Sequence, residues 1–304
     1  MVLPRIRRQH WIYKACEFPR LQKLVCILLI FFSGFTFSIS YALVGFQVAF
    51  LISMGHLGYL IYPFTRFTKK TVAHADKTSK GNKLHLIVAN VRQKNESHEK
   101  LLELLEHEKP DLILLVETNK RWQEALKPFT SSYPYKIEHP LDNTYGLLFY
   151  SKIRLEDAEV RHLVNEEYPS IKCRLQFENG ANFWFVGVHP PPPSPTERTY
   201  STPRDNELLV LAQEIASSQA PYLVAGDLND VAWSYTTDLF LKRSGLQDPR
   251  KGRGIFSTYH AERWYMRWPL DHIFCSSKFK VIDLQRLMSI GSDYFPVSIK
   301  LLFT

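Results

Sequence analysis

The feature that most constrains this chain of 304 residues is a long run without a charged side chain, from Leu24 to Phe64. A helix needs about 20 apolar residues to cross a bilayer once, and the run is about twice that length. The apolar core of a signal peptide is much shorter, at about 7–15 residues. The run therefore predicts a hairpin of two transmembrane helices, at about residues 24–41 and 43–62.

Basic side chains flank this run on both sides. They are Arg5, Arg7, Arg8, Lys14, Arg20 and Lys23 before it, and Arg66, Lys69, Lys70, Lys77 and Lys80 after it. Because Lys and Arg collect on the cytoplasmic side of a membrane, this pattern favours a hairpin with both ends in the cytoplasm. A single long tilted span is the alternative, since Ser38–Gly45 would have to turn tightly, and it would place the C-terminal part outside.

The charge of the chain divides at the same place. Residues 1–83 hold 12 Lys/Arg and two acidic residues, a net charge of +10, whereas residues 84–304 hold 26 and 28, a net charge of −2. A nearly neutral domain argues against binding long nucleic acid mainly by charge. The four cysteines show neither a disulfide nor a metal-site spacing, which favours a reducing compartment. We divide the chain into a membrane segment (1–66), a polar linker (67–83) and a folded domain (84–304).

Several strands predicted in this domain are apolar and end on a polar residue. The strand 84–90 ends on Asn90, 111–117 ends on Glu117, and 183–189 ends on His189. A helical stripe at 97–107 separates the first two strands, which predicts a βαβ crossover and an α/β fold. Because α/β enzymes bind ligands at the carboxyl ends of their strands, these three side chains are candidate site residues.

The strand 222–226 ends in Gly226-Asp227-Leu228-Asn229. In extended backbone Asp227 and Asn229 point to the same side. Such a pair can bind a hard cation, orient a water or hold a phosphate. A polar turn after a strand is the alternative, because Asp and Asn are also common turn residues.

Later segments add further candidates. Asp271 begins another predicted strand, and Asp293 lies on a turn before the last one. The loop 250–254 is either a solvated basic loop or a phosphate-facing one, and the aromatic segment 264–269 indicates core or lid packing rather than base stacking.

Six short motifs occur in a fixed order: Asn90, Glu117, His189, Asp227-x-Asn229, Asp271-His-Ile-Phe and Ser292-Asp293-x-Phe-Pro296. Together they resemble the endonuclease/exonuclease/phosphatase superfamily over residues 84–304. The hydrophobic N-terminal segment is most similar to a membrane-anchored bacterial branch, which implies the inner membrane as location. The resemblance implies an α/β fold, a four-layer sandwich in which two packed mixed sheets are flanked by helices.

The resemblance also implies a role for each matching residue in a metal-dependent phosphoesterase. Glu117 would ligate Mg²⁺ or Mn²⁺, with Asn90 nearby and Asp293 as a second carboxylate. Asp227 would orient or deprotonate the attacking water, and Asn229 would hold a phosphate oxygen. His189 would contact the phosphate or protonate the leaving group.

The last motif departs from the family pattern Ser-Asp-His-x-Pro, because Tyr294 stands in place of the histidine. In the family, Asp271 holds that histidine, so here we expect it to hydrogen-bond the phenol. A phenol is a poor base at neutral pH and cannot carry positive charge. Reduced phosphoesterase activity is therefore one hypothesis, and a catalytically weak module that binds a phosphorylated ligand at the membrane is the other.

The sequence leaves two substrate classes open, nucleic acid and phospholipid or inositol head groups. The hydrophobic segment implies contact with the lipid bilayer and favours a substrate near the membrane. The sequence indicates no protein partner.

Overall fold

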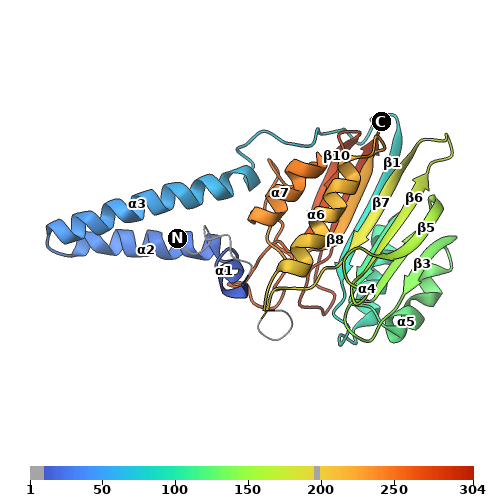
Figure 1. The fold of residues 1–304 in the computed structure, drawn as a ribbon, viewed down its shortest axis with the longest axis horizontal. Coiled ribbons are helices and arrows are strands. Elements are labelled where there is room, and N and C mark those ends of the chain that lie inside the picture. The colour runs from blue at the N-terminus through green and yellow to red at the C-terminus, as the bar shows by residue number, and fades with distance from the viewer. Residues whose placement is uncertain (1–9, 195–198) are drawn as a thin grey trace.

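The computed structural model describes residues 10–194 and 199–304. At the N-terminal end, α1 (Trp11–Ala15) is followed by α2 (Arg20–Ser33) and α3 (Tyr41–Ile61), with short 3₁₀ turns η2 (Gly34–Thr36) and η3 (Tyr62–Phe64) after the two long helices. Figure 1 shows α2 and α3 lying side by side and projecting from an α/β body. The amide of Gln47 on α3 donates a 2.9 Å hydrogen bond to the Phe31 carbonyl, so it joins the two helices.

The expected first helix at 24–41 is wrong in its bounds. Helix α2 ends at Ser33, and its 14 residues span about 21 Å, less than the ~30 Å of a bilayer core. Ser40 caps α3 by accepting a hydrogen bond from the Leu43 amide, so the turn comes earlier than expected. The second expected helix is confirmed as a helix, and Tyr41–Phe64 is long and apolar enough to cross a membrane.

The body contains two mixed sheets. The first has the order β10-β11-β1-β2-β4-β3, and the second has the order β5-β6-β7-β8-β9. The first sheet comprises β1 (Asn82–Asn90), β2 (Leu112–Val116), β3 (Tyr135–His139), β4 (Leu147–Ser151), β10 (Phe279–Arg286) and β11 (Val297–Phe303). The second comprises β5 (Arg154–His162), β6 (Pro169–Gln176), β7 (Asn182–Val188), β8 (Tyr222–Asp227) and β9 (Asp271–Cys275).

Parallel pairing brings the predicted polar strand ends to one edge of the sheets. Strand β1 pairs with β2 in parallel, which confirms the predicted βαβ crossover through α4 (His98–Glu108). Strand β7 pairs with β8 in parallel through α6 (Thr202–Ala216). In each pair the two carboxyl ends therefore lie next to each other.

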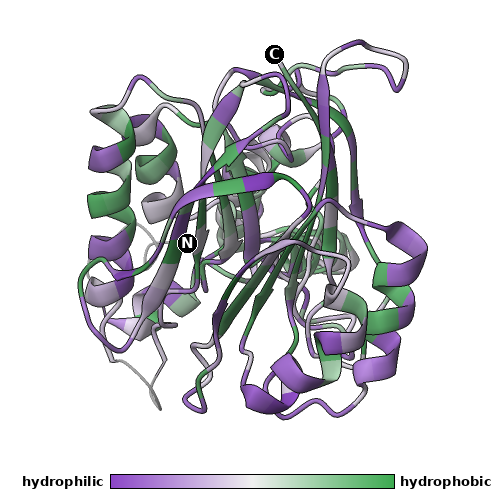
Figure 2. Cartoon of the chain, turned by 90° about the vertical axis from the view of Figure 1, so that its right-hand side faces the viewer, coloured by the Kyte–Doolittle hydropathy of each residue, from purple (hydrophilic) through white to green (hydrophobic). Residues whose placement is uncertain are grey.

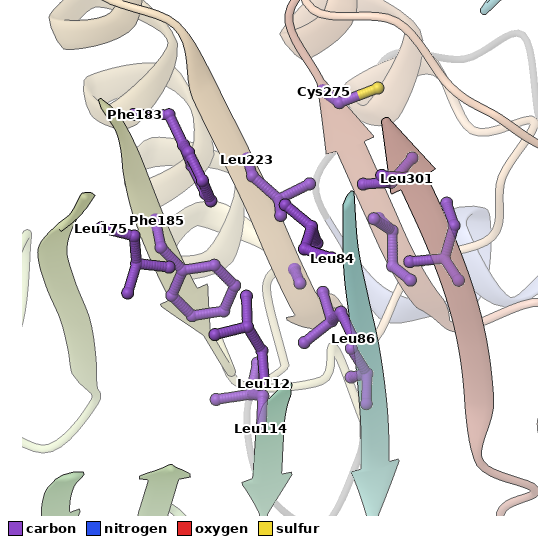
Figure 3. Packing of buried hydrophobic residues seen from close by; sticks show 14 of the residues in the cluster. Leu84, Leu86, Leu112, Leu114, Leu175, Phe183, Phe185, Leu223, Cys275 and Leu301 are labelled. Carbon is purple, nitrogen blue, oxygen red and sulfur yellow. The ribbon is translucent and has the colours of Figure 1, made fainter. Parts of the chain in front are cut away.

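The sheets and helices form four layers. The inner faces of the two sheets share one core, to which Leu86, Leu114, Phe185 and Leu223 contribute (Figure 3). Helices α4 and α5 (Lys120–Thr130) pack on the outer face of the first sheet, whereas α6 and α7 (Tyr235–Ser244) pack on that of the second. Figure 2 shows mostly hydrophobic strands in the middle of the molecule and helices in which hydrophobic and hydrophilic residues are mixed. The predicted α/β sandwich is confirmed.

The segment between the hairpin and β1 lies against the sheet. Val72 is fully buried in the inter-sheet core. The Ala75 amide donates to the Val281 carbonyl at 2.9 Å, and the Val281 amide donates to the Ala73 carbonyl at 2.8 Å. The segment predicted as a linker thus makes backbone hydrogen bonds to β10, the edge strand of the first sheet. The division at residues 66 and 83 stays a prediction.

We predict that Phe185→Ala lowers the free energy of unfolding by about 3–5 kcal/mol, because it opens a cavity in the core. Phe185 is fully buried and stacks on Phe149 of the other sheet, with ring centroids 4.4 Å apart. Urea denaturation of the full chain in detergent measures the change. Met288→Ala is the control, since Met288 is 83% exposed, and equal losses for the two variants would contradict the prediction.

Candidate active site

A cleft of about 310 Å³ opens at the carboxyl ends of β2, β7 and β8. Its lining comprises Phe18, Glu117, Thr144, Tyr145, His189, Pro192, Pro193, Asn229, Tyr259, Leu270, Asp293 and Tyr294. Five of the eight predicted site residues are in this lining. The other three, Asn90, Asp227 and Asp271, are buried. Asn90 and Asp227 hydrogen-bond lining residues, and Asp271 lies opposite Asp227 on the neighbouring strand.

The backbone after β8 is shaped by Gly226. Its φ is 146°, and a Cβ there would lie 1.8 Å from the Val188 carbonyl oxygen of the paired strand. Only glycine therefore fits at this position. The chain then turns so that the Asn229 amide donates to Asp227 Oδ1 at 2.8 Å, while the Asn229 side chain donates to the Pro190 carbonyl at 3.0 Å.

Asn90 links the two sheets beneath the cleft. Its Nδ2 donates to Glu117 Oε1 at 2.7 Å and to Asp227 Oδ2 at 3.0 Å. Glu117 has a left-handed backbone, with φ 59°, which is unusual for a residue other than glycine. The first sheet thus supplies the amide and one carboxylate, and the second sheet supplies the other carboxylate.

Burial raises the pKa of both carboxyl groups. Desolvation is the main cause of a pKa of about 7 for Glu117, and the charges of Asp227 and Asp293 raise it further. Desolvation also raises the pKa of Asp227 to about 6, although hydrogen bonds from the Asn229 amide, Asn90 and Tyr294 oppose this. Closely spaced acids of this kind favour binding of a cation.

His189 faces the cleft beside these acids. Its Nε2 lies 4.0 Å from Asp227 Oδ2, and its ring packs on Tyr145 with centroids 5.3 Å apart. Burial lowers the pKa of His189 to about 3, so the imidazole is neutral at neutral pH. It can therefore donate or accept a hydrogen bond but does not act as a cation.

The final motif completes the cleft from the first sheet. The Ser292 hydroxyl donates to the Asn90 carbonyl at 2.8 Å, which ties this turn to the end of β1. Asp293 is part of the lining, and its Oδ2 lies 3.9 Å from Arg92 Nε. Glu117 and Asp293 are thus two carboxylates on one cleft.

Tyr294 corrects one expectation. Its side chain hydrogen-bonds Asp227 rather than Asp271. Both carboxylate oxygens of Asp271 are buried without a close hydrogen-bond partner among the described residues. Burial, followed by the charge of Asp227, raises the pKa of Asp271 well above its usual range. Tyr294 therefore does not pair with the acid that holds a histidine in the family pattern, and Asp271 interacts with the Thr258 hydroxyl instead.

His272 and the basic residues of the loop 250–254 are not part of the cleft lining. His272 points to the other face of its strand, as alternation predicts, and contacts Arg250 and the Asp230 carbonyl. Arg250 pairs with Asp248, and Arg253 donates to the Val72 carbonyl. The loop 250–254 is therefore structural rather than phosphate-facing. The aromatic segment is only partly packed, because Trp264 is 77% exposed whereas Trp268 stacks on Tyr259.

Sequence reasoning missed two contributions to the site. Arg204 on α6 is fully buried, donates to the Asn229 carbonyl at 2.7 Å and pairs with Asp230 at 3.2 Å. Arg204 therefore positions the turn after β8. In the sequence, Asp230, the carboxylate that follows Asn229, was the only indication that this turn has a basic partner. Phe18, from the segment before the hairpin, lines the cleft and packs against Trp268, a long-range contact without a local sequence signal.

The oxygen-rich donor set fits a hard divalent cation. Glu117 and Asp293 lie on the cleft, and burial, with a smaller contribution from the charges of Asp227 and Asp293, raises the pKa of Glu117. Within residues 10–194 and 199–304, no three His, Cys, Asp or Glu side chains are grouped as a complete metal site. Mg²⁺ is usually held by one or two carboxylates together with water and substrate phosphate, so the two carboxylates on the cleft could hold such an ion.

The raised pKa of Glu117 gives a prediction for metal-free protein. A carboxyl group whose pKa rises on folding binds more protons in the folded state, so stability falls as pH rises from about 4.5 to about 7. We expect Glu117→Gln to stabilise the protein by about 1–2 kcal/mol near pH 8, allowing for partial solvent access, and to change little near pH 4.5.

Denaturation in a chelator at both pH values measures this difference. Glu124→Gln is the control, because the Glu124 side chain is exposed. A Glu117→Gln variant that is no more stable than the parent near pH 8 would contradict the raised pKa of Glu117.

Several solved structures share the fold of this chain. Similar solved structures include D. rerio TDP2 complexed with single strand DNA product (TM-score 0.60, 18% identity, covering 72% of this chain and 99% of that chain). The human Nocturnin catalytic domain with bound sulfate anion is also similar (TM-score 0.60, 17% identity, covering 79% and 99%). A third is an endonuclease/exonuclease/phosphatase from Bacteroides vulgatus (TM-score 0.62, 15% identity, covering 73% and 100%). At these identities the structures show a shared fold.

No curated protein sequence matches the chain. The model of the endonuclease/exonuclease/phosphatase family, whose members are hydrolases acting on phosphoester bonds, matches residues 87–293. The chain belongs to the endonuclease/exonuclease/phosphatase family.

Proposed function

We propose that this protein is a membrane-anchored, divalent-metal-dependent phosphoesterase whose activity is reduced by Tyr294. The main support is the convergence of the predicted polar residues on one cleft and its floor. Glu117, His189, Asn229 and Asp293 come from both sheets and from distant parts of the sequence. A cleft with two carboxylates, an amide and a neutral imidazole suits a phosphoester bound with a hard cation.

Each side chain has a proposed part. Glu117 and Asp293, with Asn90 nearby, would hold Mg²⁺ or Mn²⁺, which neutralises charge on the phosphate. Asn229 would hold a phosphate oxygen, and neutral His189 would donate a hydrogen bond to the phosphate or the leaving oxygen. Asp227, with a pKa of about 6, is mostly ionised at neutral pH and can accept a proton from water.

The substrate stays open between two classes. D. rerio TDP2 is described with a single strand DNA product, and human Nocturnin with a sulfate anion, so related folds accept phosphate-like groups. The hydrophobic hairpin supports a substrate near the membrane, such as a phospholipid or inositol head group. The net charge of −2 for residues 84–304 weighs against long duplex DNA.

We also propose that the hairpin anchors the protein in a bacterial inner membrane, with the catalytic domain in the cytoplasm. One helix, Tyr41–Phe64, has the length and composition for a membrane span, and only 11% of its most apolar window is buried within the protein. Basic residues on both sides of the hairpin support the cytoplasmic orientation.

A second function is supported by one observation. Asp271 is buried beside the Thr258 hydroxyl and has no histidine partner among the described residues, so the family's histidine position is not replaced by an equivalent group. This favours a module that binds a phosphorylated ligand at the membrane and turns it over slowly or not at all. Activity measurements separate the two functions.

We expect the full chain in detergent to hydrolyse bis-p-nitrophenyl phosphate when Mg²⁺ or Mn²⁺ is present and to lose this activity in a chelator. Asp227→Asn should lower the rate about 10²–10⁴-fold, because it removes the proton acceptor. Asp238→Asn, in an exposed pair with Lys242, is the matched control. A rate that Asp227→Asn leaves unchanged would argue against this active site, and a chain that binds phosphate without turnover would support the second function.

Tyr294→His tests the effect of the tyrosine directly. A histidine there could pair with Asp271, so we expect hydrolysis to rise at least about tenfold. Tyr294→Phe controls for the loss of the phenol hydroxyl. Equal rates for the parent chain and the histidine variant would mean that the missing histidine does not limit this protein.

A further inference from the structure

A second, larger groove of about 890 Å³ lies between the start of α2 and the domain. We call it the arginine groove. Its lining comprises Leu21, Gln22, Val25, Cys26, Arg66, Ile255, Phe256, Ser257, Trp264, Tyr265, Arg267, Leu284, Gln285 and Arg286. The groove is bounded by the hairpin on one side and by the loop after residue 254 and the end of β10 on the other.

The apolar part of the groove is shared by the hairpin and the domain. Leu21 and Val25 come from α2, whereas Ile255 and Trp264 come from the domain. The Gln22 amide donates to the Tyr265 carbonyl at 3.0 Å and so joins the two sides. Trp264 and Tyr265 are 77% and 55% exposed. Exposed Trp and Tyr side chains are typical of the boundary between a membrane and water.

The charge of the groove is positive and unbalanced. Arg66, Arg267 and Arg286 are in its lining, no Asp or Glu is, and none of the three arginines has an ion pair among the described residues. Arg267 and Arg286 both lie over the Phe295 ring, at 5.1 and 4.3 Å from its centroid. Burial and the charge of Arg267 lower the pKa of Arg286.

Their donors are only partly used within the protein. Arg267 Nη2 donates to the Ala261 carbonyl, but Arg267 Nε is buried without a partner among the described residues. Arg286 Nη1 donates to the Ser257 carbonyl. Guanidinium groups with free donors are well suited to a phosphate, which accepts several charged hydrogen bonds at once.

We infer that the arginine groove binds one anionic phospholipid, with its phosphate on Arg267 and Arg286 and an acyl chain along Leu21, Val25 and Ile255. A free phosphate would use the arginines but leave the apolar walls exposed, whereas a phospholipid satisfies both. The inference rests on the proposed membrane anchoring, because the hairpin that carries Leu21 and Val25 also places the groove at the bilayer.

The groove adjoins the candidate active site. Phe18 lines the cleft and packs edge-on against Trp268, and Leu21, three residues later, lines the groove. A lipid in the groove would therefore hold the start of α2 against the domain and keep the cleft next to the membrane surface.

The test uses the full chain in maltoside detergent with three probes: dioctanoyl phosphatidylglycerol, dioctanoyl phosphatidylcholine and inorganic phosphate. Tryptophan fluorescence follows binding, because Trp264 is in the groove. We expect phosphatidylglycerol to bind at least about tenfold more tightly than the other two probes, since only it provides both an unbalanced negative charge and an acyl chain.

Variants then locate the site. The double variant Arg267→Gln/Arg286→Gln should weaken phosphatidylglycerol binding by at least about tenfold, whereas Arg267→Lys/Arg286→Lys should retain most of it. Arg243→Gln is the matched control, an exposed arginine on α7 that is not part of the groove lining. Equal binding of the two lipids, or equal binding by the double glutamine variant, would overturn the inference. Phosphate binding as tight as phosphatidylglycerol binding would overturn the role of the acyl chain.

Two further measurements distinguish a failure of the lipid-binding inference from a failure of the proposed function. Hydrolysis of bis-p-nitrophenyl phosphate reports the active site, and vesicle flotation reports membrane attachment. Lipid binding that depends on the arginines in a protein without hydrolysis would support the groove and contradict only the phosphoesterase. Hydrolysis and flotation without selective lipid binding would contradict only the groove.

Discussion

The candidate site depends on two acids that face each other in the protein interior. Asp227 and Asp271 are partners in the register of the antiparallel strands β8 and β9, and both are buried. Like charges directly opposite each other destabilise a sheet, so other interactions must offset the repulsion between these two acids. Asn90, the Asn229 amide and Tyr294 donate hydrogen bonds to Asp227, while burial and the charge of Asp227 raise the pKa of Asp271 well above its usual range.

The N-terminal segment packs against the α/β domain through specific polar contacts. Lys14 on α1 pairs with Asp205 at 3.2 Å, and the Trp233 indole donates to the Glu17 carbonyl at 2.9 Å. These contacts lie beside Arg204, which positions the turn that carries Asn229. The hairpin is therefore joined to the domain through buried polar contacts, and its orientation is linked to that of the cleft.

Patterns with a local cause were predicted well. The apolar strands before Asn90, Glu117 and Asp227 form as expected because fully apolar runs need burial on both faces of a sheet. The polar strands β3 and β5 and the helix α5 were missed, since β5 is a largely exposed edge strand without alternation. The first hairpin helix was placed too late because apolar composition alone does not locate the turn that Ser40 caps.

The sequence by itself determined the fold class, the family and the set of polar residues at the strand ends, because these follow from periodicity and from motifs in a fixed order. Only the tertiary structure decided which partners those residues have. Tyr294 hydrogen-bonds Asp227 rather than Asp271, and Phe18 lines the cleft from more than 200 residues away from Asp227 in the chain. Such contacts depend on how two sheets and a hairpin pack together, and no local spacing in the sequence records that arrangement.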